Sequence, residues 1–368
     1  MIIGGRFQLE DKLGSGSFAN VYCAIDTKTN EKVAVKLEHP NGDQTKTCSE
    51  TSFLATLSNS SYFPKLIWQG KHNNSRVMVT DLLGPSLFAE YIKRNRFTNT
   101  EISSIGAQMV SALETVHDLG IIHRDIKPDN ILIDPVHGIE KVYLIDFGIA
   151  KRFADPISKQ QIPFRDDNEF SGNFMFASKN VVVGCTPSRR DDLESLTYTL
   201  IFLLTGNLPW CKKRSNSESI RERRQSGILS DNFVGIPEEL SNIVTYCQNL
   251  KYHERPNYGY ILSQLNELSK KEDFYIRSSN RRRDIIPLET EFRSRIAQKR
   301  SKSANHKGKL NAKNNIVRGQ SNVDIDNNPT IDGSSPRITP ETRKRILGLR
   351  KDSGDNISLK YMAMLCNN

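Results

Sequence analysis

Apolar and polar side chains mostly alternate along about the first 80 residues, and this period is typical of strands with one buried face. The alternation is clearest in residues 7–13, 19–26, 32–37 and 76–81. In residues 48–58, by contrast, Phe53, Leu54 and Leu57 recur at helical spacing. One helix is therefore expected among the strands.

The pattern becomes helical from Leu87 onward. One apolar stripe predicts a long helix ending near residues 117–120, and its members are Ile105, Met109, Ala112, Leu113 and Val116. Leu193–Leu204 is almost wholly apolar and too short to cross a bilayer, which is typical of a buried core helix. Two more amphipathic helices are expected near 238–250 and 258–268. The predicted fold class is α+β, with a β-rich part followed by a larger helical part.

The periodic pattern ends at about residue 280, where the charge distribution also changes. The chain has 52 Lys+Arg and 42 Asp+Glu, of which residues 281–368 contain 19 and 9, leaving 33 of each in residues 1–280. This predicts a neutral folded domain over 1–280 and a basic, mostly disordered tail over 281–368. Within the tail, only Thr342–Leu349 has a helical pattern.

The overall composition is ordinary for a globular protein, with 37% apolar and 26% charged residues. Because neither an apolar run of about 18 residues nor a basic leader with an apolar h-region is present, no membrane span or secretory signal is expected. Six scattered cysteines without a CxxC pair favour reduced thiols over a disulfide framework or a zinc site. We therefore expect a monomeric protein of the cytoplasm, the nucleus or both.

A glycine-rich turn joins the first two alternating runs. Small residues there let backbone N–H groups approach phosphates closely, although taken alone the segment is equally well an ordinary turn. The turn comprises Leu13, Gly14, Ser15, Gly16, Ser17, Phe18, Ala19, Asn20 and Val21, and they are the candidate phosphate-binding residues.

Lys36 follows on the next strand, on the face opposite to Val33 and Val35. A buried Lys needs an anionic partner, because an uncompensated charge is expensive to bury. Glu50 on the following helix is the predicted partner. The alternative is a surface Lys on an ordinary strand.

The most informative segment is HRDIKPDN at 123–130, which the triplet DFG follows at 146–148. Phosphoryl transfer requires positioning, metal ions and a group that accepts the hydroxyl proton. The residues predicted to supply these are Asp125, Lys127, Asn130 and Asp146. Asp125 would accept the proton and Lys127 would stabilise the moving phosphoryl group, while the other two offer hard oxygen ligands for Mg²⁺.

The ordered set of glycine-rich loop, Val-Ala-Val-Lys, helix Glu, HRDIKPDN and DFG resembles that of protein kinases. The resemblance implies ATP and Mg²⁺ as cofactors and proteins as substrates. Lys127, within Asp-x-Lys-Pro-x-Asn, resembles the Ser/Thr class in particular.

Further motifs resemble those of the casein kinase 1 family over about residues 6–278. They are LLGPSL (82–87), IPFR (162–165), SRRDDLESL (188–196) and NLPW (207–210). Ala177-Ser178-Lys179 stands where most kinases have Ala-Pro-Glu, and this too matches the family. The resemblance implies a protein Ser/Thr kinase that needs no activation-loop phosphate. Its two-lobed fold would have an N-lobe over about 1–83 and a C-lobe over about 84–280.

The same resemblance implies roles for individual residues. Those expected to bind ATP beyond the glycine-rich turn are Ala34, Lys36, Glu50, Thr80, Asp81, Leu83, Leu132 and Ile145, with Leu82 between two of them in the hinge. Among them, Thr80 would be the gatekeeper and 81–83 the hinge. Asp192 would brace the catalytic loop, Arg255 would be structural, and Arg124 would matter less as a phosphate clamp than in most kinases.

Two residues depart from the family pattern. Met175 stands where the family has an Arg that helps to bind phosphate-primed or acidic substrates, and Lys212–Arg214 would compensate only in part. We therefore expect weaker dependence on priming. Ala19 replaces the third glycine of the loop, and its Cβ is expected to slow catalysis or weaken ATP binding without abolishing either.

Several alternatives stay open at this point. One is a pseudokinase that binds without catalysis, which the intact Lys36, Asp125, Asn130 and Asp146 disfavour. Another is a small-molecule phosphotransferase with a kinase-like core. The tail is interpreted as a solvated arm, as a regulator acting in cis, or as a targeting segment through its basic runs. No base-reading motif accompanies those runs, so nucleic-acid binding is not predicted.

Overall fold

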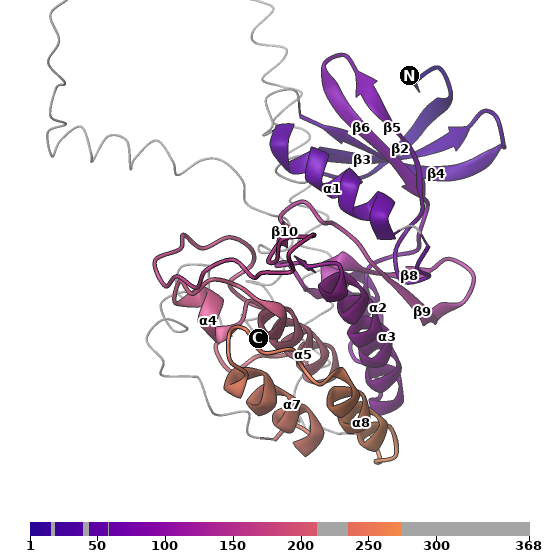
Figure 1. Ribbon diagram of the computed structural model, residues 1–368. Helices are drawn as coiled ribbons and strands as arrows, with labels where there is room; N and C mark the ends of the chain where they lie inside the picture. Colours follow the sequence, from indigo (N-terminus) through magenta and orange to yellow (C-terminus); the bar gives the residue numbers. More distant parts are fainter. Residues whose placement is uncertain (16–18, 40–43, 58, 212–234, 274–368) are drawn as a thin grey trace, which may run out of the picture. The chain divides into compact units, whose positions relative to one another are not determined.

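The computed structural model describes residues 1–273, except residues 16–18, 40–43, 58 and 212–234. Its largest sheet lies in the N-terminal region and is antiparallel (Figure 1). In sheet order, the strands are β1 (Ile2–Ile3), β2 (Phe7–Ser15), β3 (Ala19–Asp26), β4 (Glu31–Glu38), β6 (Ser75–Asp81) and β5 (Leu66–His72). The four alternating runs of the sequence coincide with β2, β3, β4 and β6, so these predictions are confirmed.

One face of this sheet forms a small core of its own. The buried members are Ile3, Phe7, Ala24, Val33, Val35, Val77 and Val79. Because side chains on a strand point alternately to the two faces, burying Val33 and Val35 turns Ala34 and Lys36 to the opposite face. The strand pattern thereby orients Lys36.

Helix α1 (Gln44–Leu57) packs beside β5 and β6 (Figure 1). The helix begins earlier than the predicted 48–58. The sequence does not reveal this start, because residues 44–47 are polar and carry no apolar period. Phe53, Leu54 and Leu57 are buried as predicted, and they join the large core that extends into the helical region.

The C-terminal region is mainly helical and is built around one large core. Its helices are α2 (Leu87–Arg94), α3 (Asn99–Asp118), the 3-10 helix η1 (Pro128–Asn130), α4 (Lys179–Val182), α5 (Arg189–Thr205), α7 (Glu238–Asn249) and α8 (Tyr258–Ser269). Two short antiparallel pairs add β7 (Ile121–Ile122) with β10 (Lys151–Arg152), and β8 (Ile131–Asp134) with β9 (Gly138–Leu144). The predicted α+β fold is confirmed.

Helices α3 and α5 form the centre of this core. The whole predicted stripe of α3 is buried, and a capping box of Thr98 and Glu101 fixes where the helix begins. Helix α5 is buried along nearly its full length, as expected for a core helix. None of the helices in the described part of the chain is long and apolar enough to cross a membrane.

Several predictions fall on residues that the structure does not describe. They concern the tail over 281–368 with Thr342–Leu349, and the basic Lys212–Arg214. Cys23, Cys185 and Cys247 are free thiols, as predicted. Within the described residues, no group of three or more His, Cys, Asp or Glu side chains could hold a metal ion.

Candidate active site

Lys36, Glu50 and Asp146 meet although they come from β4, α1 and the turn after β9. Lys36 Nζ donates to Glu50 Oε1 (2.7 Å), to Glu50 Oε2 (2.9 Å) and to Asp146 Oδ1 (3.0 Å). Burial alone would lower the pKa of Lys36, but the charges of Asp146 and Glu50 outweigh burial and raise it. The charge of Lys36 in turn lowers the pKa of Asp146 to about 2. A cation and an anion are thus both held charged at neutral pH.

The strand register places the predicted adenine-binding residues around Lys36. Val21 on β3 lies opposite Lys36, and Ala34 on β4 lies opposite Thr80 on β6. Since directly opposite residues of antiparallel strands share a face, these four side chains line one surface of the sheet.

The hinge segment after β6 is tied to strand β8. Gly84 N donates to Ile133 O (2.9 Å), and Ile133 N donates to Pro85 O (3.0 Å). A Cβ on Gly84 would lie 2.9 Å from Ile133, so only glycine allows this approach. The approach brings Leu132 beside the hinge, where Ser86 forms a bridge to it.

The catalytic loop gathers Asp125, Lys127 and Asn130. Lys127 Nζ donates to Asp125 Oδ2 (2.6 Å), and Asn130 Nδ2 donates to the same oxygen (2.9 Å). Burial would lower the pKa of Lys127, but the neighbouring charge of Asp125 outweighs it and raises the pKa. Asp125 Oδ1 is the carboxylate oxygen that lacks a hydrogen-bond partner among the described residues. The loop therefore presents a fixed carboxylate next to a fixed positive charge.

A divalent cation would find oxygen ligands between this loop and Asp146. Asn130 uses its amide nitrogen toward Asp125, which leaves its Oδ1 as an available oxygen ligand. Asp146 keeps 42% of its side chain exposed, and Ile145 N donates to Asn130 O (3.0 Å), which joins the two segments. One carboxylate and one amide oxygen suit a hard cation that completes its coordination with water and phosphate oxygens.

Asp192, at the start of α5, holds the backbone of the catalytic loop. Its carboxylate accepts from His123 N (2.7 Å), Arg124 N (2.8 Å) and His117 Nε2 (3.1 Å). Arg124 has a φ of 71°, a left-handed conformation that is strained for an Arg. The buried carboxylate therefore stabilises a loop shape that its own residues do not favour.

The model of the protein kinase domain matches residues 7–266, which is most of the chain. The chain belongs to the protein kinase family. Membership implies ATP as the phosphoryl donor, proteins as substrates and, typically, a divalent metal. The β-sheet N-terminal region and the helical C-terminal region are those of this family.

Most of the predicted site residues of this kinase lie together, in the arrangement just described. Gly16, Ser17 and Phe18 lie outside the described residues, so their part in the glycine-rich loop stays a prediction. Leu13 is exposed and Ala19 is buried. The roles in catalysis and ATP binding stay predictions that this geometry supports.

Three contributors to the site are not found by reasoning from the sequence. They are His117, which bonds to Asp192, and the pair Ser178 and Asp191. His117 sits within an ordinary amphipathic helix, and only its burial in the fold distinguishes it. Asp191 is adjacent to Asp192 in the same motif, but sequence letters do not show that the two face different segments.

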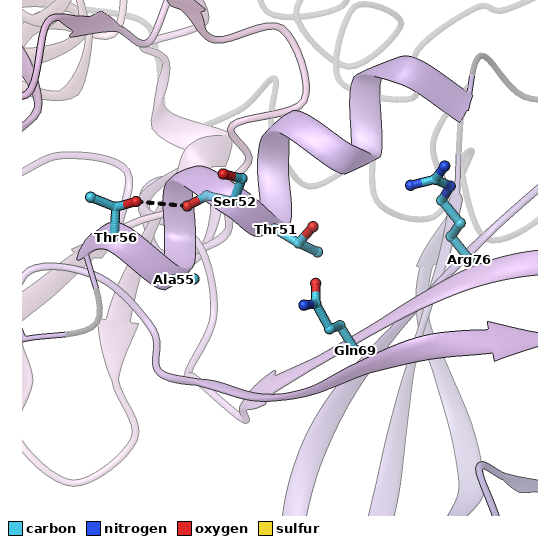
Figure 2. Close-up of a pocket in the computed structure, with 6 residues that line it drawn as sticks. All are labelled: Thr51, Ser52, Ala55, Thr56, Gln69 and Arg76. Atoms are coloured by element: carbon cyan, nitrogen blue, oxygen red, sulfur yellow. Dashed lines mark hydrogen bonds between the residues drawn. The ribbon is translucent and has the colours of Figure 1, made fainter. Parts of the chain in front are cut away.

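Behind helix α1, the kinase has a cavity of about 560 Å³ that is separate from Lys36 and Asp146. Figure 2 shows it between the helix and strands β5 and β6. Its lining residues are Thr51, Ser52, Ala55, Thr56, Gln69 and Arg76. The face of α1 that lines the cavity carries Thr51, Ser52, Ala55 and Thr56. The apolar residues Phe53, Leu54 and Leu57 of the same helix pack into the large core instead.

Proposed function

We propose that this kinase transfers the γ-phosphoryl group of ATP to Ser and Thr hydroxyls of proteins, with Mg²⁺, as a casein kinase 1-type enzyme. The observation that carries the proposal is the 2.6 Å contact between Lys127 Nζ and Asp125 Oδ2. A Lys at this distance places a positive charge where negative charge develops during transfer to a hydroxyl. Lys127 is also the residue by which the catalytic loop resembles the Ser/Thr class.

Each charged group of the site then has a role. Asp125 orients the acceptor hydroxyl and takes its proton, while Lys36, held by Glu50, binds the non-transferred phosphates. Asn130 and Asp146 would hold Mg²⁺, which neutralises phosphate charge when bound. The fit rests on their hard oxygen atoms and on the exposure of Asp146.

The casein kinase 1 type is supported by what two of its motifs do in the fold. Gly84 and Pro85, from LLGPSL, bond to the backbone of β8 and so connect the hinge to Leu132. Asp191 and Asp192, from SRRDDLESL, are both buried and hydrogen-bonded to segments of the site. These residues hold the site in place rather than contact ATP.

Weaker dependence on priming phosphate also belongs to this proposal. Met175 is 1% exposed, and its carbonyl accepts from Trp210 Nε1 (2.8 Å). Its side chain is therefore part of the core. The position where the family has a substrate-binding Arg carries neither charge nor an accessible side chain here.

Phosphate incorporation into casein tests the proposal. Wild-type protein should label Ser and Thr residues of casein in a Mg²⁺-dependent manner, and Asp146→Asn should reduce labelling by at least about 100-fold. Equal labelling by the two proteins would refute the catalytic assignment and favour the pseudokinase alternative. Phosphoamino-acid analysis of the labelled casein decides between Ser/Thr and Tyr specificity.

Regulation in cis by the tail is a separate part of the proposal. Its support is compositional: acceptor residues such as Ser301, Ser303 and Thr339 lie within the strongly basic segment. Truncation after about residue 285 should raise the rate of an enzyme that has been allowed to autophosphorylate. An unchanged rate would contradict regulation by the tail. We also propose a monomer located in the cytoplasm, the nucleus or both.

A further inference from the structure

The cavity between α1 and strands β5 and β6 has a mainly polar lining. The helix contributes hydroxyl groups and the strands contribute an amide and a guanidinium, from Thr51, Ser52, Thr56, Gln69 and Arg76. Figure 2 shows Thr51 and Gln69 facing each other across the space. Cavities that stay empty are apolar, so this lining suits a polar ligand.

Some of these groups have hydrogen-bonding capacity to spare. Thr56 Oγ1 donates to Ser52 O (2.9 Å), which occupies the hydroxyl proton of Thr56. Among the described residues, neither the Ser52 hydroxyl nor the Gln69 amide makes a hydrogen bond. Both side chains are exposed, so water satisfies them, and a polar ligand can take the place of that water.

The charges at the cavity favour an anion. Lys71 on β5 is directly opposite Arg76 on β6, so the two cations share one face of the sheet. Lys71 is exposed and forms no ion pair within the described part of the chain. Burial raises the pKa of Glu38, and the charge of Arg76 opposes this rise, so Glu38 offsets part of the positive charge. Together, the three groups leave one positive charge.

The size of the cavity indicates more than a bound ion. Its volume of about 560 Å³ falls within the range of about 300–1,000 Å³ that is common for small-molecule sites. A water molecule takes up only about 30 Å³. The lining, the charge and the volume together suit a small organic molecule with an anionic group.

The cavity adjoins the helix that holds Glu50. Thr51, which lines it, follows Glu50 directly in α1, and Glu50 Oε1 accepts from Lys36 Nζ (2.7 Å). On the sheet, Arg76 shares a face with Met78, which is directly opposite Lys36. A ligand there would lie between the helix that carries Glu50 and the sheet face that carries Lys36.

We propose that this cavity is an effector site for a small organic anion, either a phosphate ester or a carboxylate. The anionic group lies beside Arg76 and Lys71 and accepts from Ser52 and Gln69. The ligand adds contacts between α1 and the sheet, which favours the position of α1 in which Glu50 holds Lys36 and so raises affinity for ATP. The effect on ATP rests on the proposed function, whereas binding of the anion does not.

Calorimetric titration of the full-length protein tests the site, with Mg²⁺ and the ATP analogue AMP-PNP present to fill the ATP site. Phenyl phosphate and benzoate represent the two anion classes, and the tighter of them identifies the preferred class. Benzyl alcohol has a similar ring but no charge, and should bind at least about tenfold more weakly than the better anion. Equal binding of the alcohol, or no binding of either anion, would overturn the proposal.

Three variants locate the binding. Arg76→Gln should weaken anion binding at least about tenfold, the effect of losing a hydrogen bond between charged groups. Lys71→Gln, at an exposed position where folding is not at risk, should weaken it about threefold. Lys28→Gln is the control, because Lys28 is an exposed Lys in the β3–β4 turn, near the other end of β6. Its effect should stay below about 1.5-fold. Equal affinities in all three variants would place the anion elsewhere and overturn the proposal.

Titration of AMP-PNP with and without phenyl phosphate tests the link to the ATP site. The probe should tighten AMP-PNP binding at least about threefold in the wild type and leave it unchanged in Arg76→Gln. Weaker binding of AMP-PNP would indicate competition at the ATP site, and either that result or no change would overturn the effector role. Neither titration requires phosphoryl transfer, so a protein that bound AMP-PNP but did not label casein would refute the proposed function separately.

Discussion

Replacing Asp192 by Asn isolates the link between α5 and the catalytic loop. The two side chains have nearly the same shape, but Asn keeps only one acceptor oxygen and replaces the other by an NH₂ donor. In the native protein, one oxygen accepts from Arg124 N, and the other accepts from His123 N and His117 Nε2. In either orientation of the Asn side chain, its NH₂ group would face the backbone N–H of His123 or of Arg124, and that hydrogen bond would be lost.

The size of the effect follows from these bonds. A hydrogen bond to a charged acceptor contributes about 1.5–3 kcal/mol, and the unpaired buried N–H adds a desolvation cost. Asp192→Asn should therefore lower the free energy of unfolding by about 2–4 kcal/mol. For a domain of this size, that corresponds to a decrease in Tm of roughly 5–15 °C.

The catalytic effect has a different origin. Arg124 is held in a left-handed conformation that costs about 1–2 kcal/mol, so loss of its bond to Asp192 lets the loop relax. Asp125 is the next residue and would move with it. Since a displacement of about 1 Å at a reacting group costs on the order of 100-fold in rate, kcat should fall by about that factor.

Asp134→Asn is the matched control. Asp134 is a buried Asp whose carboxylate also accepts several hydrogen bonds, but in the β8–β9 hairpin. The donors are Val136 N (2.8 Å), His137 N (2.9 Å), His137 Nδ1 (3.0 Å) and Tyr143 OH (2.8 Å). Asp134→Asn should lower Tm by a similar amount and leave kcat within about threefold. The assay is peptide phosphorylation at a temperature where both variants are folded, with Tm measured by circular dichroism. The reasoning fails if Asp192→Asn keeps kcat within twofold, or if both variants lose kcat equally.

Three further predictions concern single interactions. Glu50→Gln removes one of the two anions beside Lys36, so kcat/KM for ATP should fall by about 10–100-fold; a change below twofold would contradict the ion pair's role. The pKa of Asp191 is raised above that of an unfolded Asp, so the folded state binds the carboxyl proton more tightly. The free energy of unfolding therefore falls by up to about 3 kcal/mol as pH rises from about 4 to 6. Asp191→Asn should remove that component, which urea midpoints at pH 4.5 and 7.5 would reveal; identical differences in both proteins would argue against it. With Met175 buried, a phosphate-primed peptide should be preferred over its unprimed twin by less than about tenfold, and a 100-fold preference, about 2.7 kcal/mol, would show that priming is read elsewhere.

Much of the fold is readable from the sequence because one face of each element is buried. The alternation in β4 and the stripe of α3 both report burial directly, and the structure confirms them. Strand β5 is missed because none of its side chains is fully buried and its apolar residues, Leu66, Ile67 and Trp68, are consecutive rather than alternating. The start of α1 is missed because its first turn is polar and packing farther along the helix decides the conformation.

The active site likewise has features that the sequence predicts and features that only the fold reveals. Lys36 and Glu50 can be paired from the sequence because a charged residue on a half-buried strand needs a partner, and the first helix offers one. The division of labour between Asp191 and Asp192 cannot be predicted so, since it depends on which loops pass each face of α5. Likewise, Met175 is buried in a core that includes Trp210, a residue distant in the sequence that also donates to the Met175 carbonyl.

The positions of Asp191 and Asp192 also limit how the chain length can change. Successive residues of a helix point about 100° apart, so the two acids reach different segments only in one rotational setting of α5. Inserting a single residue between Asp192 and Leu193 would rotate both carboxylates by about 100° relative to the buried remainder of α5, which would disconnect the catalytic loop and Ser178 together. The β8–β9 turn makes neither of these contacts. A change of length there would leave the Asp191–Ser178 bond and the bonds of Asp192 to the catalytic loop in place.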